Sequence, residues 1–425
     1  MTSRAELGNL GLGNLELSDP RVPGVALIGD SSALARLLAG AGEQLLDRGY
    51  LRYKPGTSLI AGLRLTSGPA FAYAVSAEAR PKLAKLIERA PEGAVLVNAA
   101  AVSVLIARPS ADRDLPALAD PDRLSAAVGR RTTSWTTLAY KPQRRWVGRP
   151  NGEPCDAEQK DAEQKDAGQK DAGQEPMLRA YRPGELPEAM TGWRLAERLA
   201  GAHADVRLPT ARTVSARRGL AAVSWLPGTP LDRLSAAGSS SRVLADVGAA
   251  LARVHDSLPP RPGDTVLDVR ASRPVLTELA AVLPTLRRRL ASLLRALEAQ
   301  APRPATIHPV HGDFSADQVI VARDGGIGIA DWDRAGWGDP GSDLGSLRAA
   351  GLSETAYAAV LGGYATVRAV PTSTEWHCLV AVVQRLTEPL RCARTDWRSE
   401  IADRLEWAES HLGDLATRGA GTCAG

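Results

Sequence analysis

The sequence predicts an α+β protein built in two lobes. Strand-like segments separated by single helices occupy the first half of the chain, and Ala221–Leu226 is the last of these strands. A short connector follows at Pro227-Gly228, and beyond Gly345 apolar residues recur at helical spacing to about Leu415. Strands first and helices afterwards is typical of an α+β fold, in which the two kinds of element are segregated.

Composition narrows the class of protein. The 425 residues allow two or three domains, and 44% hydrophobic with 24% charged residues is typical of a globular chain. Lys and Arg together number 52 and leave a net charge of only +4, and the arginines are scattered, so we expect no nucleic-acid partner. Four cysteines without Cys-x-x-Cys spacing do not suggest a disulfide framework. We expect no secretory leader and no membrane association, and hence a cytoplasmic protein; monomer or homodimer stays open.

The N-terminal elements follow from apolar spacing and turn residues. Leu34, Leu37 and Leu38 at helical intervals predict a helix, and Pro55-Gly56 interrupts a strand-like stretch as a turn does. In chain order we expect a loose arm over 1–23, a helix over Ser32–Asp47, strands within Tyr50–Leu65 and over Phe71–Val75, a helix over Ala77–Ala90, and one or two buried strands within Gly93–Ala107.

Residues 156–175 differ from everything around them. They form four tandem pentads, DAEQK twice, then DAGQK and DAGQE, without a branched or aromatic side chain. Such a segment cannot bury enough apolar surface to offset the entropy lost on ordering. We expect a disordered insert in a tolerant loop, with a functional tail as the alternative.

A short pattern occurs two times in the chain, once before and once after residue 100. Leu51-Arg52-Tyr53-Lys54-Pro55 returns as Leu138-Ala139-Tyr140-Lys141-Pro142, and each copy leads to a further strand and then a helix. Lys54 and Tyr73 are 19 positions apart; Lys141 and Arg179 are 38 apart, or 18 once the 20 pentad residues are removed. The matched spacing predicts a duplicated sheet-and-helix unit, with coincidence as the alternative.

Further along, helices alternate with short connections. Amphipathic spacing predicts helices over Ser241–Ser257 and Val275–Gln300, the second with Arg287–Arg289 on its solvated side, and His255 is interpreted as a packed helix residue. The expected division is an N-terminal subdomain over 1–130, a strand-rich lobe over 131–228 that includes the insert, and a helical lobe over 229–425.

One region carries recognisable chemistry. Two short strands, Val319–Val321 and Gly328–Ala330, flank a turn at Asp324-Gly325-Gly326. A hairpin brings its outer ends together, so Asp313, Gln318 and Asp331 are expected to converge. Two carboxylates and an amide oxygen suit Mg²⁺ with waters and phosphates, and a carboxylate not needed by the metal could accept a proton from a hydroxyl.

These residues also resemble a known family. His-Gly-Asp at 311–313, an amide at Gln318, Asp-Trp-Asp at 331–333 and Gly-Asp-Pro-x-x-Asp-Leu at 338–344 together resemble the aminoglycoside phosphotransferase family of protein-kinase-like enzymes. The resemblance covers roughly Thr137–Leu412. It implies a bilobal kinase-like fold with an antiparallel-sheet N-lobe and a mostly helical C-lobe. The leading 130 residues look like the extra N-terminal α/β subdomain of maltokinases and their actinobacterial relatives.

The resemblance implies roles for individual residues. Asp313 would be the catalytic aspartate that orients and deprotonates the acceptor hydroxyl, while Gln318 and Asp331 would ligate the Mg²⁺ that bridges the nucleotide phosphates. His311 and Asp343 would hold the catalytic loop by hydrogen bonds.

The nucleotide would meet residues of the other lobe. Arg179 stands where the family has its phosphate-binding Lys, and Arg is planar and longer than Lys. The usual glutamate partner of that cation would be Glu188 or Glu197. Trp225 and Leu226 stand where the connector between the lobes offers backbone groups to adenine or guanine.

The resulting expectation is an O-phosphotransferase that uses ATP or GTP with Mg²⁺ to phosphorylate a small hydroxylated acceptor. An aminoglycoside or other amino sugar ranks beside a simple sugar such as maltose or glucosamine. The alternative is a weak or inactive nucleotide-binding pseudokinase, since Arg179 replaces the Lys. The segment from Pro371 to Leu415 holds eight acidic and five basic residues, Arg385 among them, and three Trp, which could contact a sugar or line the core.

Overall fold

The computed structural model divides the described part of the chain into two compact units. It describes residues 13–129, 132, 134–151, 176–200, 202, 206–236, 240–263, 272–303 and 306–421. The pentads at 156–175 lie outside these residues. The first unit is built from 16–190 and 209–225, and the second from 191–208 and 226–425 together with the residues up to 15. The expected boundaries at residues 130 and 228 remain a prediction.

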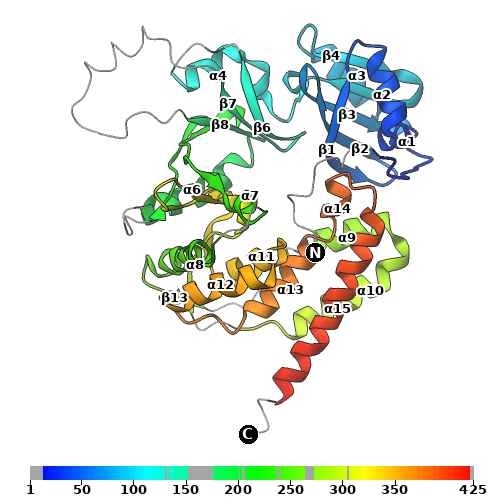
Figure 1. Cartoon of the computed structure of the whole chain (residues 1–425). Helices are drawn as coiled ribbons and strands as arrows, with labels where there is room; N and C mark the ends of the chain where they lie inside the picture. Colours follow the sequence, from blue (N-terminus) through cyan, green and yellow to red (C-terminus); the bar gives the residue numbers. More distant parts are fainter. Residues whose placement is uncertain are drawn as a thin grey trace, which may run out of the picture. The chain divides into compact units, whose positions relative to one another are not determined.

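The unit that spans 16–225 contains two five-stranded antiparallel sheets (Figure 1). In the first sheet the strands, in spatial order, are β1 (Leu45–Lys54), β2 (Ser58–Leu65), β3 (Gly68–Val75), β5 (Val104–Ala107) and β4 (Val95–Ala99). Helices α1 (Gly24–Gly29) and α2 (Ser31–Ala39) precede it, and α3 (Arg80–Arg89) connects β3 to β4. Leu83 and Leu86 of α3 pack with Phe71 and Leu105 of the sheet, which buries the apolar face of the helix.

The second sheet has the same order of strands along the chain. Its strands are β6 (Trp135–Lys141), β7 (Arg145–Pro150), β8 (Met177–Tyr181), β11 (Leu220–Val223) and β10 (Ala211–Ser215). Helix α4 (Pro121–Ala127) precedes it, and α6 (Leu186–Ala200) follows β8. Leu115, Leu124 and Trp146 pack with Leu178 and Leu220 in one core. The matching topologies agree with the predicted duplication.

The other unit is mostly helical and carries two small sheets. One sheet has the order β12 (Thr229–Pro230), β15 (Val319–Val321), β16 (Ile327–Ile329) and β9 (Val206–Arg207); the other has β13 (Arg261–Pro262), β14 (Thr306–Val310) and β17 (Gly336–Gly338). The helices are α7 (Leu231–Ala236), α8 (Ser241–Asp256), α9 (Ser272–Val282), α10 (Arg287–Ala299), α11 (Gly341–Ala349), α12 (Glu354–Ala365), α13 (Thr374–Gln384), α14 (Glu388–Arg391) and α15 (Trp397–Gly421).

Two glycines allow α8 and α12 to lie in direct contact, side by side in Figure 1. A Cβ at Gly248 of α8 would lie 1.9 Å from the carbonyl oxygen of Val360, and one at Gly363 of α12 would lie 1.9 Å from that of Ala245. The two helix backbones therefore pack more closely than a residue with a side chain at either glycine position would allow. Near the C-terminal end of α8 the same two helices meet again, where His255 Nδ1 lies 2.9 Å from the hydroxyl oxygen of Tyr364 in α12.

The predicted α+β class is confirmed, and three local expectations are wrong. The helix expected over 32–47 ends at Ala39, because Gly42 turns the chain in the left-handed region (φ +74°), and Leu45 already begins β1. The helix expected over 275–300 is broken into α9 and α10 at Pro284, which lacks the backbone N–H that a continuous helix needs. Residues 1–12 of the arm expected over 1–23 lie outside the described residues, and the rest is not loose, since Leu15, Leu17 and Val22 are buried.

None of the helices within the described ranges is both long and apolar enough to cross a membrane.

Candidate functional site

The predicted hairpin exists and brings two of the expected residues together. β15 pairs with β16 through Val319–Ile329, Ile320–Gly328 and Val321–Ile327, and Gly325 turns the chain with φ +83°. Beyond the Val319–Ile329 pair, at the end away from the turn, the Ala330 N–H donates to the carbonyl oxygen of Gln318 at 2.8 Å. Gln318 and Asp331 are therefore neighbours across the open end of the hairpin, although 13 positions separate them in the sequence.

The loop that carries Asp313 is held by one carboxylate. Asp343, in the first turn of α11, accepts hydrogen bonds from the backbone N–H groups of His311 (2.7 Å) and Gly312 (2.8 Å). Its side chain is fully buried. Because these N–H groups belong to the two residues directly before Asp313, their hydrogen bonds to Asp343 hold the backbone at Asp313 in position. The structure agrees with the loop-holding role expected for Asp343.

The buried Asp343 is kept ionised by its neighbours. His255 Nε2 lies 3.0 Å from one Asp343 oxygen, and His255 Nδ1 lies 2.9 Å from the hydroxyl oxygen of Tyr364. Burial alone would raise the pKa of Asp343, but hydrogen bonding and charge from His255, together with the nearby His311, outweigh burial and lower it. His255 is packed as expected; that it orients Asp343 is visible only in the structure.

The Asp313 loop is also tied to the hairpin. His311 Nε2 lies 2.7 Å from the carbonyl oxygen of Ala330, the residue before Asp331. Gly312 has φ +80°, and a Cβ there would lie 2.3 Å from the Arg334 carbonyl oxygen, so only glycine fits. Asp331 itself has φ +64°, which is rare for a residue with a side chain and is found where function imposes strain. Asp313, Gln318 and Asp331 thus belong to one connected network.

Two arginines flank Asp313. Arg334 Nη1 lies 3.4 Å from one Asp313 oxygen, and Arg385 Nη2 lies 3.5 Å from the other. The Arg385 side chain is 16% exposed and also donates to Ser346 Oγ at 2.9 Å, whereas Arg334 is 64% exposed. Neither is identified as a site residue from the sequence, because 21 and 72 positions separate them from Asp313.

A tryptophan from α6 contacts the turn after Asp331. Trp193 is almost fully buried, and its Nε1 donates to Asp333 Oδ1 at 2.8 Å. A Cβ on Gly192 would lie 2.1 Å from the Trp332 carbonyl oxygen, so α6 approaches this turn at backbone distance. No local signal in the sequence pairs Trp193 with Asp333, which lie 140 positions apart.

The expected nucleotide residues are distributed over both units. Arg179 lies on the central strand β8, opposite Val147 on one side and Ala221 on the other, and is 4% exposed. Trp225 is half-buried in the same unit, with Arg149 4.9 Å above its ring. Leu226 belongs to the helical unit, where its Cδ1 lies 3.2 Å from the Cβ position of Gly328.

The donor set at the hairpin fits Mg²⁺. Gln318 and Asp331 are half-buried, carry side-chain oxygens and lie next to each other across the hairpin, and Mg²⁺ takes few protein oxygens besides phosphates and waters. Across the described ranges no group of three His, Cys, Asp or Glu residues forms a candidate metal site. The expected site uses an amide in addition to carboxylates.

Comparison with known proteins supplies the family. Residues 167–377 match the sequence model of the phosphotransferase enzyme family. The chain carries a phosphotransferase domain of this family. The expected recognition, fold class and enzyme class, a phosphotransferase that acts on a small molecule, agree with it. The maltokinase-like character of the N-terminal residues is a resemblance only. No match is found among curated proteins.

Solved structures of such phosphotransferases resemble the chain at low identity. The macrolide 2'-phosphotransferase MphH from Brachybacterium faecium is 21% identical over 64% of this chain and 92% of its own, with a TM-score of 0.41. The choline kinase LicA from Streptococcus pneumoniae is 12% identical over 70% and 99%, with a TM-score of 0.46. The GDP complex of wild-type aminoglycoside 2'-phosphotransferase-IIIa is 17% identical over 70% and 99%, also with a TM-score of 0.46.

Proposed function

We propose that this protein transfers the γ-phosphoryl group of ATP or GTP to a hydroxyl of a small molecule. The observation that carries the proposal is the double hydrogen bond from His311 and Gly312 to Asp343. It presents Asp313 from a rigid loop that the His311–Ala330 hydrogen bond joins to the hairpin. Phosphoryl transfer depends mainly on such positioning and on charge neutralisation, because the protein does little covalent chemistry itself.

Each expected site residue then has a task. Asp313 would accept the proton of the acceptor hydroxyl and align its oxygen. Gln318 and Asp331 would hold Mg²⁺, whose charge neutralises the nucleotide phosphates. Arg179 would contribute a further positive charge to the phosphates, and the backbone of Trp225 and Leu226 would bind the base.

The surroundings of Asp313 favour one class of acceptor. A hydroxyl that reaches Asp313 also comes near Arg334 and Arg385. These guanidinium groups would repel a polycationic aminoglycoside, hydrogen-bond to a neutral sugar and attract an anionic group. Among the acceptors expected from the sequence, we therefore place a neutral sugar ahead of a cationic amino sugar, and add hydroxylated acids as candidates.

Release of nucleoside diphosphate tests the transfer. Purified protein is incubated with Mg²⁺ and ATP or GTP and a panel that contains maltose, glucosamine, an aminoglycoside and a sugar acid. We expect release above background with a neutral or anionic acceptor, and loss of that release in Asp313→Asn. Asp396→Asn is the matched control. Asp396 also lies near an arginine, Arg394, but it is exposed and is more than 60 positions from the hairpin in the sequence.

A pseudokinase is the competing function. It is favoured by Arg179, which stands in place of the expected Lys and is nearly buried. A thermal-shift measurement with Mg²⁺ and nucleotide separates the two functions. Stabilisation by nucleotide without release above the Asp313→Asn background for any acceptor would support the pseudokinase and contradict the transferase.

A further inference from the structure

The two sheets of the unit over 16–225 are equivalent strand by strand. Both have three consecutive antiparallel strands, then a helix, then a hairpin whose second strand pairs with the third (Figure 1). The registers also correspond. Tyr73 lies between Ile60 and Leu105, as Arg179 lies between Val147 and Ala221. We call residues 19–107 the first copy and residues 112–223 the second copy.

Equivalence extends to the final hairpin of each copy. The first copy turns through Ala100–Val102 and the second through Ala216–Arg218, each a single 3₁₀ turn. Each turn ends in a left-handed residue, Ser103 (φ +55°) or Gly219 (φ +67°), whose N–H donates to the first residue of the turn at 3.2 Å. Turns of equal length at equal places are expected of a duplication rather than of coincidence.

Each copy also contains the same buried lock, formed by an aspartate, a tyrosine and a turn. In the first copy, Asp19 accepts from the Tyr53 hydroxyl (2.9 Å) and the Gly56 N–H (2.6 Å). In the second copy, Asp112 accepts from the Tyr140 hydroxyl (3.1 Å) and the Gln143 N–H (2.7 Å). These are the tyrosines of the repeated Tyr-Lys-Pro pattern. The lock holds the turn between the first two strands of its copy.

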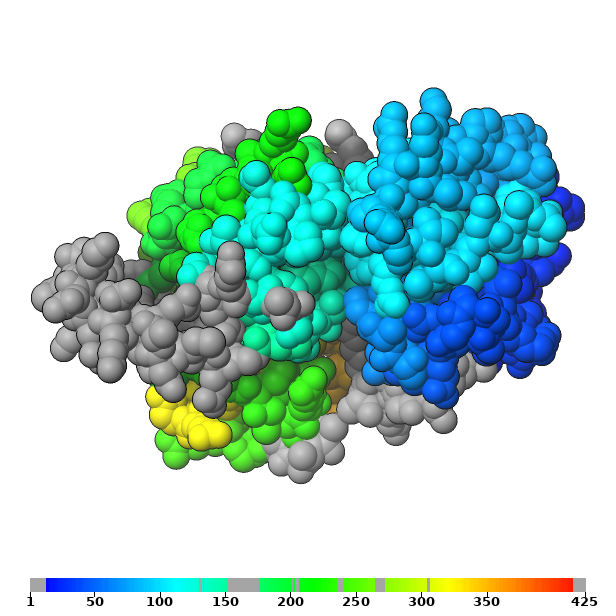
Figure 2. Space-filling model, turned by 90° about the horizontal axis from the view of Figure 1, so that it is seen from above, coloured from blue at the N-terminus to red at the C-terminus, as the bar shows by residue number. Residues whose placement is uncertain are grey.

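The copies differ where the second would meet a nucleotide. The position of Arg179 is occupied by Tyr73 in the first copy, and Tyr73 packs in the same hydrophobic cluster as Ile60, Phe71 and Tyr140. The first copy therefore has no cation at this place and packs against the second copy instead. Figure 2 shows the blue surface of the first copy beside the cyan surface of the second.

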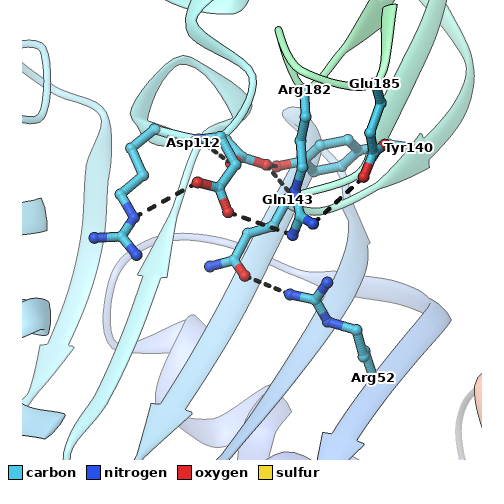
Figure 3. Close-up of polar contacts among 8 residues, drawn as sticks. Arg52, Asp112, Tyr140, Gln143, Arg182 and Glu185 are labelled. Carbon is cyan, nitrogen blue, oxygen red and sulfur yellow. Dashed lines mark hydrogen bonds and ion pairs between the residues drawn. The ribbon is translucent and has the colours of Figure 1, made fainter. Parts of the chain in front are cut away.

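The packing is concentrated on the β6–β7 turn, residues 141–144. Arg52 of β1 donates to the Gln143 side-chain oxygen at 2.5 Å (Figure 3). A Cβ on Gly62 of β2 would lie 3.3 Å from Pro142 Cδ, so the sheet of the first copy approaches the turn at contact distance. Gln143 has φ +58°, a conformation that glycine adopts more easily, as Gly56 does in the first copy. The turn is thus held from both sides, by Asp112 and by Arg52.

The turn lies near Arg179 and is rich in positive charge. Arg145, the residue after the turn, pairs with Tyr181, two positions along β8 from Arg179. Lys141, Arg144 and Arg145 follow one another around the turn. Burial lowers the pKa of Arg52; the charges of Arg182 and Arg144 add to this effect, while Tyr50 and Asp114 oppose it, so several guanidinium groups are close to one another here. Arg182 forms ion pairs with Asp114 and Glu185. Such a cluster suits the phosphates of a nucleotide.

We propose that the first copy is a platform that holds the β6–β7 turn against the nucleotide phosphates, with Asp112 and Arg52 as positioning residues. The proposal rests on the proposed function, since it assigns the turn to the phosphate end of ATP or GTP. It also explains why the first copy keeps the lock and the sheet while it lacks the cation at position 73. The platform acts on nucleotide binding and leaves the acceptor contacts at Asp313 unchanged.

The test compares the two locks in the full-length protein. Asp112→Asn replaces one of two accepting carboxylate oxygens by an N–H₂ group, which cannot accept a hydrogen bond. Asp19→Asn makes the same change in the first copy. Equilibrium binding of a fluorescent ATP or GTP analogue should weaken about tenfold in Asp112→Asn and less than about twofold in Asp19→Asn. Hydrogen exchange over 141–147 should accelerate about tenfold in Asp112→Asn only.

A second variant covers the case in which Asp112→Asn does not fold. Arg52→Met removes the contact to Gln143 and leaves both locks intact, and it should raise the KM for nucleotide several-fold with kcat and the KM for acceptor unchanged. Equal binding and equal exchange over 141–147 in wild type, Asp112→Asn and Arg52→Met would overturn the platform. If the wild type binds no nucleotide, the proposed function fails, whereas the exchange measurement still decides whether the first copy holds the turn.

Discussion

Asp343→Asn is the most informative single substitution, because it changes the support of the 311–313 loop without touching Asp313. One Asp343 oxygen accepts from the His311 N–H and lies 3.0 Å from His255 Nε2, and the other oxygen accepts from the Gly312 N–H. An asparagine has one acceptor oxygen. In its better orientation it keeps the oxygen that serves His311 and His255, and turns an N–H₂ group toward the Gly312 N–H.

The magnitude follows from this count of hydrogen bonds. The substitution loses one buried hydrogen bond to a charged acceptor and leaves a donor facing a donor, which costs about 2 kcal/mol. We expect urea unfolding, followed by circular dichroism, to show this loss in the free energy of unfolding. If Asp313 is released to the same extent, kcat falls about 30-fold, since each 1.4 kcal/mol is a factor of ten.

Asp339→Asn is the matched control. Asp339 belongs to the same Gly-Asp-Pro motif, is buried, and accepts from the Gly341 N–H at 2.8 Å, but it has no contact with the Asp313 loop among the hydrogen bonds of the described residues. It should lose comparable stability and keep its kcat. A kcat that falls equally in Asp339→Asn and Asp343→Asn, or that is unchanged in Asp343→Asn at a lowered stability, would refute the positioning argument.

Three further outcomes are expected. Gly363→Ala should lower the free energy of unfolding by about 3 kcal/mol, because its Cβ would collide with the α8 backbone. The adjacent Gly362→Ala has open space around it and should raise the free energy of unfolding by up to about 1 kcal/mol; urea titration measures both changes. The pKa of Asp343 is lowered in the folded state, so its contribution to stability is present above the ordinary aspartate pKa of 3.8 and is lost as the pH falls through the folded pKa. Unfolding titrations across acidic pH should therefore show a shallower loss of stability in Asp343→Asn than in wild type. Trp193→Phe removes the hydrogen bond to Asp333 and should cost about 1 kcal/mol in the same titration, and an unchanged midpoint would exclude this contact as a stabilising one.

The elements that were predicted correctly are those with a local cause. Asp324-Gly325-Gly326 is a turn sequence between two apolar runs, and its hairpin could be placed to within one residue. The repeated Tyr-Lys-Pro pattern indicated two related sheets, because equal strands and turns require equal spacing. Errors arose where one residue decides an element: Pro284 breaks a continuous helical pattern, and Gly42 ends a helix before Leu45.

The residues along the chain already indicate the loop at 311–313, the hairpin that joins Gln318 to Asp331 and the duplicated sheet, and with them the class of chemistry. Each depends on short-range patterns, and short-range patterns are what local propensity and turn chemistry control. The partners of these groups become visible only once the chain is folded. His255 orients Asp343 from 88 positions away, Arg385 approaches Asp313 from the end of α13, and Asp112 holds a turn that begins 29 residues later. Such pairs form because packing brings distant groups together and because a buried polar group needs a hydrogen-bond partner. Hydrophobic periodicity in the sequence does not indicate which distant residue that partner is.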